Sequence, residues 1–204
     1  MIKLKSTLTK LNNEIQLLGT REHGDVLVIG VFHGDEVQGK FLIEEFIKKN
    51  PQSSLLFIPC LNPDGLLDGE RTNSNGVDLN RNFPTANWVL SEKNEFFGGE
   101  TPASEIETRF LIEIIEQYRP ATILTLHAPF KVVNYDGDAK ELAEKISKII
   151  GYPVQENIGY PTPGSFGTYA GVERSIKTIT LELDEICPVE ELISKTHTIL
   201  DLLL

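Results

Sequence analysis

Three polar side chains that follow apolar segments could together bind a metal ion. His33 and His127 each come directly after an apolar run, and Glu36 lies three positions beyond His33. On a turn that enters a helix, this spacing lets His33 and Glu36 face one point. Two imidazoles and one carboxylate are typical ligands of a catalytic zinc, whose fourth position stays open. A lone His-x-x-Glu motif is a weak signal, however: Asp35 competes with Glu36, and His127 could be an ordinary histidine at a strand end.

Glu182 is the exceptional residue of a further apolar run. Alternation along a strand places it on the face that it shares with Thr178 and Thr180. A carboxylate in so apolar a segment is costly to bury unless it is paired, which favours a functional role over a structural one. An ordinary pairing with a lysine or a helix terminus is the alternative.

The elements that must position these residues alternate between two kinds of pattern. Short apolar runs predict strands at 26–32, 55–61, 121–126 and 176–183. Helical periodicity predicts helices at 36–49, 103–118, 138–150 and 189–203, the second of which would start at Thr101-Pro102.

Strands that alternate with helices need crossover connections. The sequence therefore predicts one α/β domain over residues 1–204, with a mainly parallel mixed central sheet and helices on both faces. Ligands bind beyond the carboxyl ends of the strands in such a sheet, so His33, His127 and Glu182 are expected to converge. Two loops rich in Asn, Asp, Gly and Pro, at 62–100 and 159–171, are expected to form the walls of the site.

Composition argues against several classes of partner. The 204 residues carry a net charge of −11, which disfavours a nucleic-acid surface and docking on an anionic membrane. Cys60 and Cys187 fit reduced thiols better than a disulfide framework. Neither the apolar core of a signal peptide nor a run of 18 apolar residues occurs, so we expect a cytoplasmic protein. Monomer and homodimer stay open.

A set of ordered motifs between about residues 26 and 184 resembles the M14 family of zinc carboxypeptidases, and within it the murein peptide amidases. In chain order the motifs are His33-x-x-Glu36, Asn62-Pro63-Asp64-Gly65, Arg71, Gly76-Val77-Asp78-Leu79-Asn80-Arg81-Asn82-Phe83, His127, Gly164-Ser165-Phe166-Gly167-Thr168-Tyr169 and Thr180-Leu181-Glu182. The full ordered set is specific, whereas any single piece is not.

This resemblance implies the metal site and the acid–base group. It makes His33, Glu36 and His127 the ligands of one zinc ion per chain, and Glu182 the general base and acid. It also makes Arg71 the residue that polarises the scissile carbonyl, a role that suits a planar guanidinium with a permanent charge.

The resemblance implies the substrate contacts as well. Asn80 and Arg81 would hold a substrate carboxylate, with Arg81 donating two parallel N–H bonds. Tyr169 is similar to the mobile tyrosine of the family, although it is closer to Glu182 in sequence than in the digestive enzymes.

The implied reaction is zinc-dependent hydrolysis of a peptide bond next to a free carboxylate in a small peptide. The pattern of the amidases points to the γ-D-glutamyl to meso-diaminopimelate bond of murein tripeptide, cleaved during cell-wall recycling. One alternative is an N-acyl amino acid hydrolase related to aspartoacylase or succinylglutamate desuccinylase, which the GVDLNRNF stretch disfavours. A catalytically silent module that binds peptidoglycan fragments is another, and the retained ligands and Glu182 argue against it.

Overall fold

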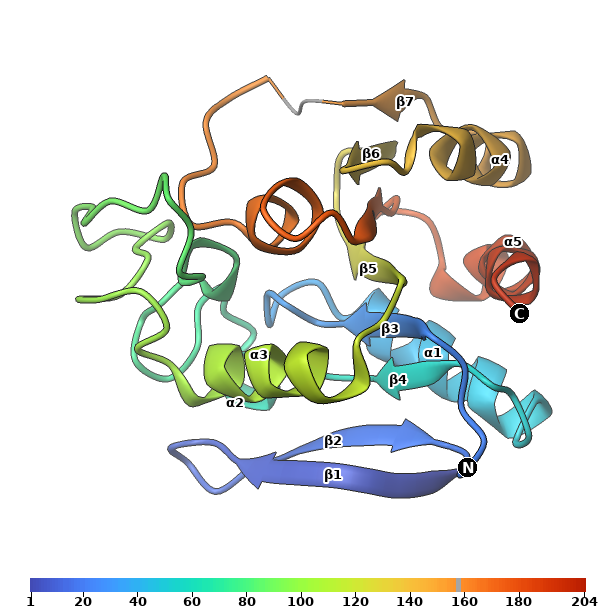
Figure 1. Ribbon diagram of the computed structural model, residues 1–204, viewed down its shortest axis with the longest axis horizontal. Helices are drawn as coiled ribbons and strands as arrows, with labels where there is room; N and C mark the ends of the chain where they lie inside the picture. Colours follow the sequence, from blue (N-terminus) through green and yellow to red (C-terminus); the bar gives the residue numbers. More distant parts are fainter. Residues whose placement is uncertain (157–158) are drawn as a thin grey trace.

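The computed structural model describes residues 1–156 and 159–204, which build one eight-stranded sheet in the order β1-β2-β4-β3-β5-β8-β6-β7 (Figure 1). The strands are β1 Ile2–Leu8, β2 Glu14–Gly19, β3 Val26–Gly30, β4 Leu56–Ile58, β5 Thr122–His127, β6 Val132–Asp136, β7 Val154–Gln155 and β8 Lys177–Glu182. The helices are α1 Gln38–Lys49, α2 Pro63–Asp68, α3 Ile106–Tyr118, α4 Lys140–Ile150 and α5 Val189–Leu202, with a 3₁₀ turn η1 at Leu79–Arg81 and a π-helical segment η2 at Thr168–Val172.

The four predicted strands form the parallel centre of the sheet. β3 pairs in parallel with β4 and β5, and β5 pairs in parallel with β8. On either side the sheet continues through antiparallel pairs, β2 with β4 and β6 with β8. The predicted α/β class with a mainly parallel mixed sheet is confirmed.

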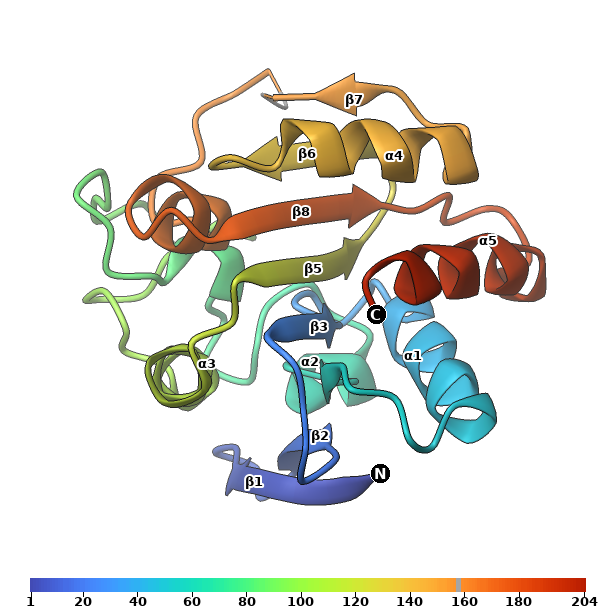
Figure 2. The same ribbon diagram turned by 45° about the vertical axis from the view of Figure 1, so that its right-hand side comes forward.

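Helices cover both faces of this sheet (Figure 2). Leu42, Phe46, Ile146 and Ile199 of α1, α4 and α5 pack with Val28, Leu124 and Ile179 in one fully buried cluster. Phe110 and Ile114 of α3 pack with Leu27, Ile29 and Ile123 in a second cluster on the other face. Each fully buried side chain of this size contributes about 1.5–3 kcal/mol through removal from water, so the alternating apolar strands are held from both sides.

Four strands were not predicted from the sequence. β1 is an edge strand with no buried residue, and its lysines hide the period-two pattern. β7 has two residues, and β6 carries Asn134 and Asp136 among its apolar residues. These three strands depend on hydrogen bonds from neighbouring strands more than on an apolar pattern of their own. β2 does alternate, with Ile15 and Leu17 buried, and was overlooked.

The predicted start of α3 at Thr101-Pro102 was wrong. The helix begins at Ile106, because the preceding segment binds Asn82 instead of entering the helix. The Asn82 side-chain amide donates to the Thr101 carbonyl at 3.2 Å, and the Ala103 N–H donates to the Asn82 carbonyl at 2.6 Å. Similarly, α1 begins at Gln38 and not at residue 36, which leaves Glu36 on the turn.

The long segment 62–100 contains local structure of its own. Asn62 caps α2 by accepting a hydrogen bond from the Gly65 N–H at 3.0 Å, and Pro63 occupies the first helical position. A Cβ at Gly34 would lie 2.0 Å from the Gly65 carbonyl carbon, so only glycine lets the turn at 33–36 approach α2 this closely. Among the described residues, no helix is both long and apolar enough to cross a lipid bilayer.

Candidate active site

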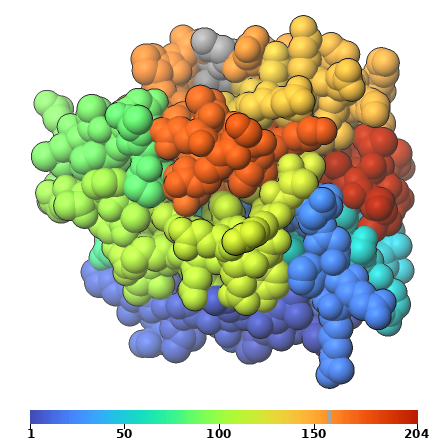
Figure 3. Space-filling model, in the orientation of Figure 1, coloured from blue at the N-terminus to red at the C-terminus, as the bar shows by residue number. Residues whose placement is uncertain are grey.

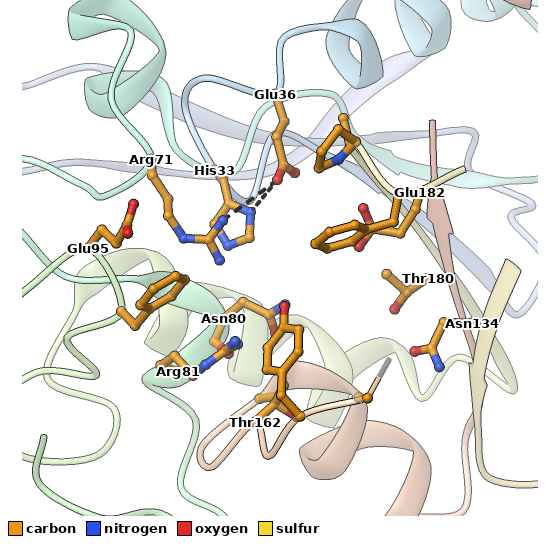
Figure 4. Close-up of a pocket in the computed structure, with 18 of the residues that line it drawn as sticks. His33, Glu36, Arg71, Asn80, Arg81, Glu95, Asn134, Thr162, Thr180 and Glu182 are labelled. Atoms are coloured by element: carbon orange, nitrogen blue, oxygen red, sulfur yellow. Dashed lines mark hydrogen bonds and ion pairs between the residues drawn. The ribbon is translucent and has the colours of Figure 1, made fainter. Parts of the chain in front are cut away.

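The carboxylate of Glu36 joins His33, on the turn after β3, to His127, the last residue of β5. Figure 4 shows the His33 and Glu36 side chains facing each other. The Glu36 Oε1 atom lies 2.8 Å from His33 Nδ1, and the Glu36 Oε2 atom lies 2.9 Å from His127 Nδ1. One ligand atom from each residue lies within 4.8 Å of the others, and all three residues are buried. Asp35 is exposed and is not part of this group. Two imidazole nitrogens and a carboxylate oxygen facing one point are a donor set that fits catalytic zinc.

The backbone before His33 takes an unusual conformation that aims the turn at the site. Val31 has a φ of 53°, a left-handed value that β-branched residues rarely adopt. The Asn62 N–H donates to the Val31 carbonyl at 3.0 Å, and the Glu36 N–H donates to the His33 carbonyl at 3.2 Å. These two hydrogen bonds hold the turn that follows β3.

The buried charged groups of the candidate metal site shift one another's pKa values. Burial by itself lowers the pKa of His33, but the carboxylates of Glu36 and Asp78 outweigh it and raise the pKa to about 9. Burial likewise acts to raise the pKa of Glu36, whereas the two histidines lower it to about 2. A metal ion at this group has to displace the proton of His33, since metal ligands bind in their deprotonated form.

Asp78 contacts both His33 and Arg71 through its carboxylate. Its Oδ1 atom lies 3.1 Å from His33 Nε2 and accepts a hydrogen bond from the Asn80 N–H at 2.8 Å. Its Oδ2 atom accepts hydrogen bonds from Arg71 Nε and Nη2 at 3.1 and 2.9 Å. Burial would raise the pKa of Asp78, but His33 and Arg71 hold it well below its usual range. A carboxylate on the second nitrogen of a metal-binding histidine fixes that ring, so Asp78 is a candidate supporting residue to which the sequence analysis assigned no role.

Arg71 lies at the edge of this cluster and points into the pocket beside His33 (Figure 4). Its Nη1 atom is 3.8 Å from Glu36 Oε1, and its guanidinium carbon lies 5.2 Å from the centre of the Phe96 ring. Asp78 fixes one edge of the guanidinium, which leaves the remaining N–H groups available for an oxygen in the pocket.

Glu182 stands next to His127 in the sheet. The two residues are register partners on β5 and β8, and Glu182 is 7% exposed. Its Oε2 atom is buried and has no hydrogen-bond partner among residues 1–156 and 159–204. Burial raises the pKa of this carboxyl group above its ordinary value. A desolvated carboxylate that lines a pocket and has one oxygen without a hydrogen-bond partner is suited to accept a proton.

Asn80 and Arg81 lie on η1 and line the same pocket, which has a volume of about 710 Å³. Asn80 Oδ1 accepts a hydrogen bond from the Phe166 N–H at 2.8 Å, and this contact fixes the orientation of the side-chain amide. Arg81 Nη1 donates to the Asn80 carbonyl at 2.7 Å. η1 itself is anchored through Asn82, which donates to the Gly98 carbonyl at 2.8 Å.

The two loops expected to form the walls of the site lie against each other on one face of the molecule, green and orange in Figure 3. The Phe83 N–H donates to the Gly164 carbonyl at 2.9 Å, and the Gly164 N–H donates to Asn87 Oδ1 at 3.2 Å. Residues of both loops line the pocket. This expectation is confirmed.

Tyr169 lies away from the pocket, unlike the other predicted site residues, which line it or, in the case of His127, contact a lining residue. Its ring is 1% exposed and packs 5.2 Å from the centre of the Phe83 ring, because η2 turns it toward the core. Arg174 covers the other side of this ring at 3.4 Å and donates to the Tyr169 carbonyl. Tyr160, which is 44% exposed, lines the pocket instead. The sequence pointed to Tyr160 only through its position at the start of the loop at 159–171, which we expected to form a wall of the site.

The mainly parallel sheet carries a candidate His-Glu-His metal site and a buried glutamate at its carboxyl edge, and its fold is that of the carboxypeptidases. Residues 5–160 match the family model of the zinc carboxypeptidases, peptidase family M14. The chain belongs to this family and is a hydrolase.

Two curated relatives and two solved structures illustrate the similarity. Murein peptide amidase A of Escherichia coli K12 is 33% identical over 181 residues, which is 82% of this chain and 73% of that protein. Murein peptide amidase A of Vibrio campbellii is 32% identical over 174 residues, which is 78% of this chain and 69% of that protein. The crystal structure of murein-tripeptide amidase MpaA from Escherichia coli O157 superposes with a TM-score of 0.82 at 29% identity, and the match covers 96% of this chain and 89% of that one. Carboxypeptidase A of Helicoverpa armigera shares the fold, with a TM-score of 0.75 at 17% identity, and the match covers 95% of this chain and 64% of that one.

Proposed function

We propose that this chain hydrolyses the γ-D-glutamyl to meso-diaminopimelate bond of murein tripeptide with the help of one zinc ion, in the cytoplasm, during cell-wall recycling. The observation that carries the proposal is that Glu182 lines the same pocket as His33 and Glu36, which form one donor group with His127. The similarity to murein peptide amidases over most of the chain supports the choice of substrate.

His33, Glu36 and His127 would hold the zinc ion. When bound there, zinc supplies a Lewis acid, which lowers the pKa of water toward about 7 and polarises a carbonyl oxygen. Glu182 accepts the proton of the attacking water, since its carboxylate is buried and its Oε2 atom has no hydrogen-bond partner among the described residues. The same carboxyl group then delivers the proton to the leaving amine.

Arg71 and Arg81 would act on two different parts of the substrate. Arg71, held by Asp78, donates to the oxygen on which negative charge develops during attack. Arg81 and the Asn80 amide bind the free carboxylate next to the scissile bond, because a guanidinium can donate two parallel hydrogen bonds to it. The two contacts together place the scissile carbonyl between Arg71 and Glu182.

A turnover assay tests this function. Purified, zinc-loaded protein is incubated with L-Ala-γ-D-Glu-meso-diaminopimelate, and free diaminopimelate is measured by mass spectrometry, with the Glu182→Gln variant as the matched control. Release by the unmodified protein and not by the variant supports the proposal. Cleavage of N-acetylaspartate but not of the tripeptide would favour the N-acyl amino acid hydrolases, and binding without cleavage would favour a silent recognition module.

A further inference from the structure

Glu105 is a buried glutamate, and it is not among the described residues that line the pocket. It stands at the N-cap of α3, yet its side chain makes no capping hydrogen bond within the described part of the chain. Shorter side chains such as Ser, Thr, Asp and Asn are the ones that reach the first N–H groups of a helix. Burying a carboxylate is costly unless hydrogen bonds compensate for it, so the partners of Glu105 indicate what this residue holds in place.

One oxygen of this carboxylate holds the start of the segment 73–82. The Oε2 atom accepts hydrogen bonds from Asn73 Nδ2 at 2.8 Å and from Asn75 Nδ2 at 2.7 Å. Asn73 Oδ1 in turn accepts hydrogen bonds from the Asn75 and Val77 N–H groups at 3.0 and 3.1 Å. These contacts fix the turn that leads directly into Asp78.

The other oxygen closes a ring of hydrogen bonds at the end of the same segment. Ser104 Oγ donates to Glu105 Oε1 at 2.6 Å, and Asn82 Nδ2 donates to Ser104 Oγ at 2.9 Å. The Glu105 N–H donates to Asn82 Oδ1 at 3.2 Å, which completes the ring. An ionised carboxylate can only accept hydrogen bonds, so Glu105 sets the direction of the Ser104 hydroxyl and, through it, of the fully buried Asn82 amide.

The residues between these two ends carry the proposed contact with the substrate carboxylate. Asn80 and Arg81 lie there on η1 and line the pocket. The backbone of η1 is closely surrounded, since a Cβ at Gly98 would lie 2.6 Å from the Arg81 carbonyl oxygen and a Cβ at Gly164 would lie 2.1 Å from it. With so little free space, a displaced end of the segment cannot be absorbed without moving Arg81.

We propose that Glu105 is a positioning residue: through Ser104 and Asn82 it sets the orientation of η1, and thereby the affinity of the pocket for a substrate carboxylate. This inference rests on the proposed function, because it takes Asn80 and Arg81 as the groups that hold this carboxylate. A role of Glu105 in stability alone would change the free energy of unfolding without changing the preference between a charged and a neutral ligand.

Binding measurements test the inference without turnover. Zinc-loaded protein with Glu182→Gln serves as the parent and is titrated calorimetrically with L-Ala-γ-D-Glu-meso-diaminopimelate and with an analogue whose carboxylate next to the scissile bond is amidated. We expect the parent to prefer the tripeptide roughly 10- to 100-fold, the range of hydrogen bonds between charged groups. Glu105→Gln should lower this preference roughly 3- to 10-fold by weakening the tripeptide alone. Its amide must either reverse the bond with Ser104 or place N–H groups against two asparagine amides.

Ser104→Ala is the second variant, because it breaks the ring at a small, partly exposed residue and changes no charge. It should lower the preference by a similar factor. Glu107→Gln is the matched control and should keep the preference. Glu107 is also buried and accepts a hydrogen bond from Asn73 at 3.3 Å, but within residues 1–156 and 159–204 no hydrogen bond joins it to Ser104 or Asn82. Zinc content and melting temperature are measured for every variant.

An unchanged preference in either Glu105→Gln or Ser104→Ala overturns the inference, and so does an equal loss in Glu107→Gln or equal binding of the two peptides by the parent. If Glu105→Gln fails to fold, the result with Ser104→Ala decides alone. Turnover of the tripeptide by protein that retains Glu182 is scored separately. Its absence, together with a preference that depends on Glu105, counts against the proposed function alone.

Discussion

His127 and Glu182 are the last residues of two neighbouring parallel strands and stand opposite each other in the register of β5 and β8. His127 belongs to the candidate metal-binding group, and Glu182 carries a buried carboxylate that lines the pocket. The sheet therefore sets the position of the proposed acid–base group relative to the candidate metal site through backbone hydrogen bonds. This arrangement makes the two functions separable by mutation.

Glu182→Gln should retain zinc and lose turnover. The amide is nearly isosteric with the carboxylate but cannot accept a proton, and a positioned acid–base group contributes about 10²–10⁴-fold to the rate. Metal content by elemental analysis and turnover of the tripeptide measure the two effects. Near-normal turnover would remove Glu182 from the mechanism.

His127→Ala should leave the zinc site largely empty. The substitution removes one of three protein ligands, and the remaining two do not complete the set that is typical of catalytic zinc. His23→Ala is the matched control, because His23 contacts Tyr118 and does not belong to the metal-binding group. Equal zinc content in both variants would contradict the assignment.

Asp78→Asn should weaken zinc binding and turnover together. Loss of a carboxylate that orients a metal-binding histidine costs about 10- to 100-fold in metal affinity or activity. Here the same carboxylate also holds Arg71, so turnover at saturating zinc should stay low after the metal is restored. Competition with a zinc chelator measures the zinc affinity of the variant. Full recovery of turnover at high zinc would show that Asp78 acts through metal binding and not through Arg71.

Arg81→Ala should remove discrimination for the free carboxylate of the substrate. Breaking a partly desolvated charge pair costs about 2–5 kcal/mol, and zinc occupancy should not change. Arg81→Lys should restore only part of the loss, because an ammonium cannot form two parallel bonds. The tripeptide is compared with an analogue whose corresponding carboxylate is amidated. The same preference in the unmodified protein and Arg81→Ala would show that the anion is recognised elsewhere.

Asp136→Asn should stabilise the fold at neutral pH but not in acid. Burial raises the folded-state pKa of Asp136 to about 6, above the value of about 3.9 in an unfolded chain. The charged carboxylate therefore costs folding free energy above pH 6, and this cost disappears as the pH falls toward 4. We expect a gain of about 1–2 kcal/mol at pH 8, after an allowance for partial exposure. Urea unfolding of the unmodified protein and of Asp136→Asn, both with a chelator, measures this difference in the free energy of unfolding. An equal gain at pH 4 and pH 8 would contradict an origin in the burial of the charged carboxylate.

The parallel centre of the sheet and most of the site residues were predictable from the sequence. The apolar runs that became β3 and β5 have a strong pattern of their own, since both faces of these strands pack in apolar clusters, and β8 packs one apolar face in the same way. His33 and His127 could be placed because they follow such runs directly. Parallel strands carry whatever follows them to the same edge of the sheet, so their convergence was implied by the fold class.

Other features were decided by tertiary structure alone. Asp78 was part of a quoted motif but had no role assigned to it, and Tyr169 was expected at the substrate although η2 turns it into the core. The positions of both residues depend on contacts between residues far apart in the chain, such as Asp78 with His33 and Tyr169 with Phe83. Local periodicity reports which residues are buried, because burial repeats with the geometry of each element. It carries no information on which buried or half-buried groups meet, since that follows from strand register and from the packing of loops against one another.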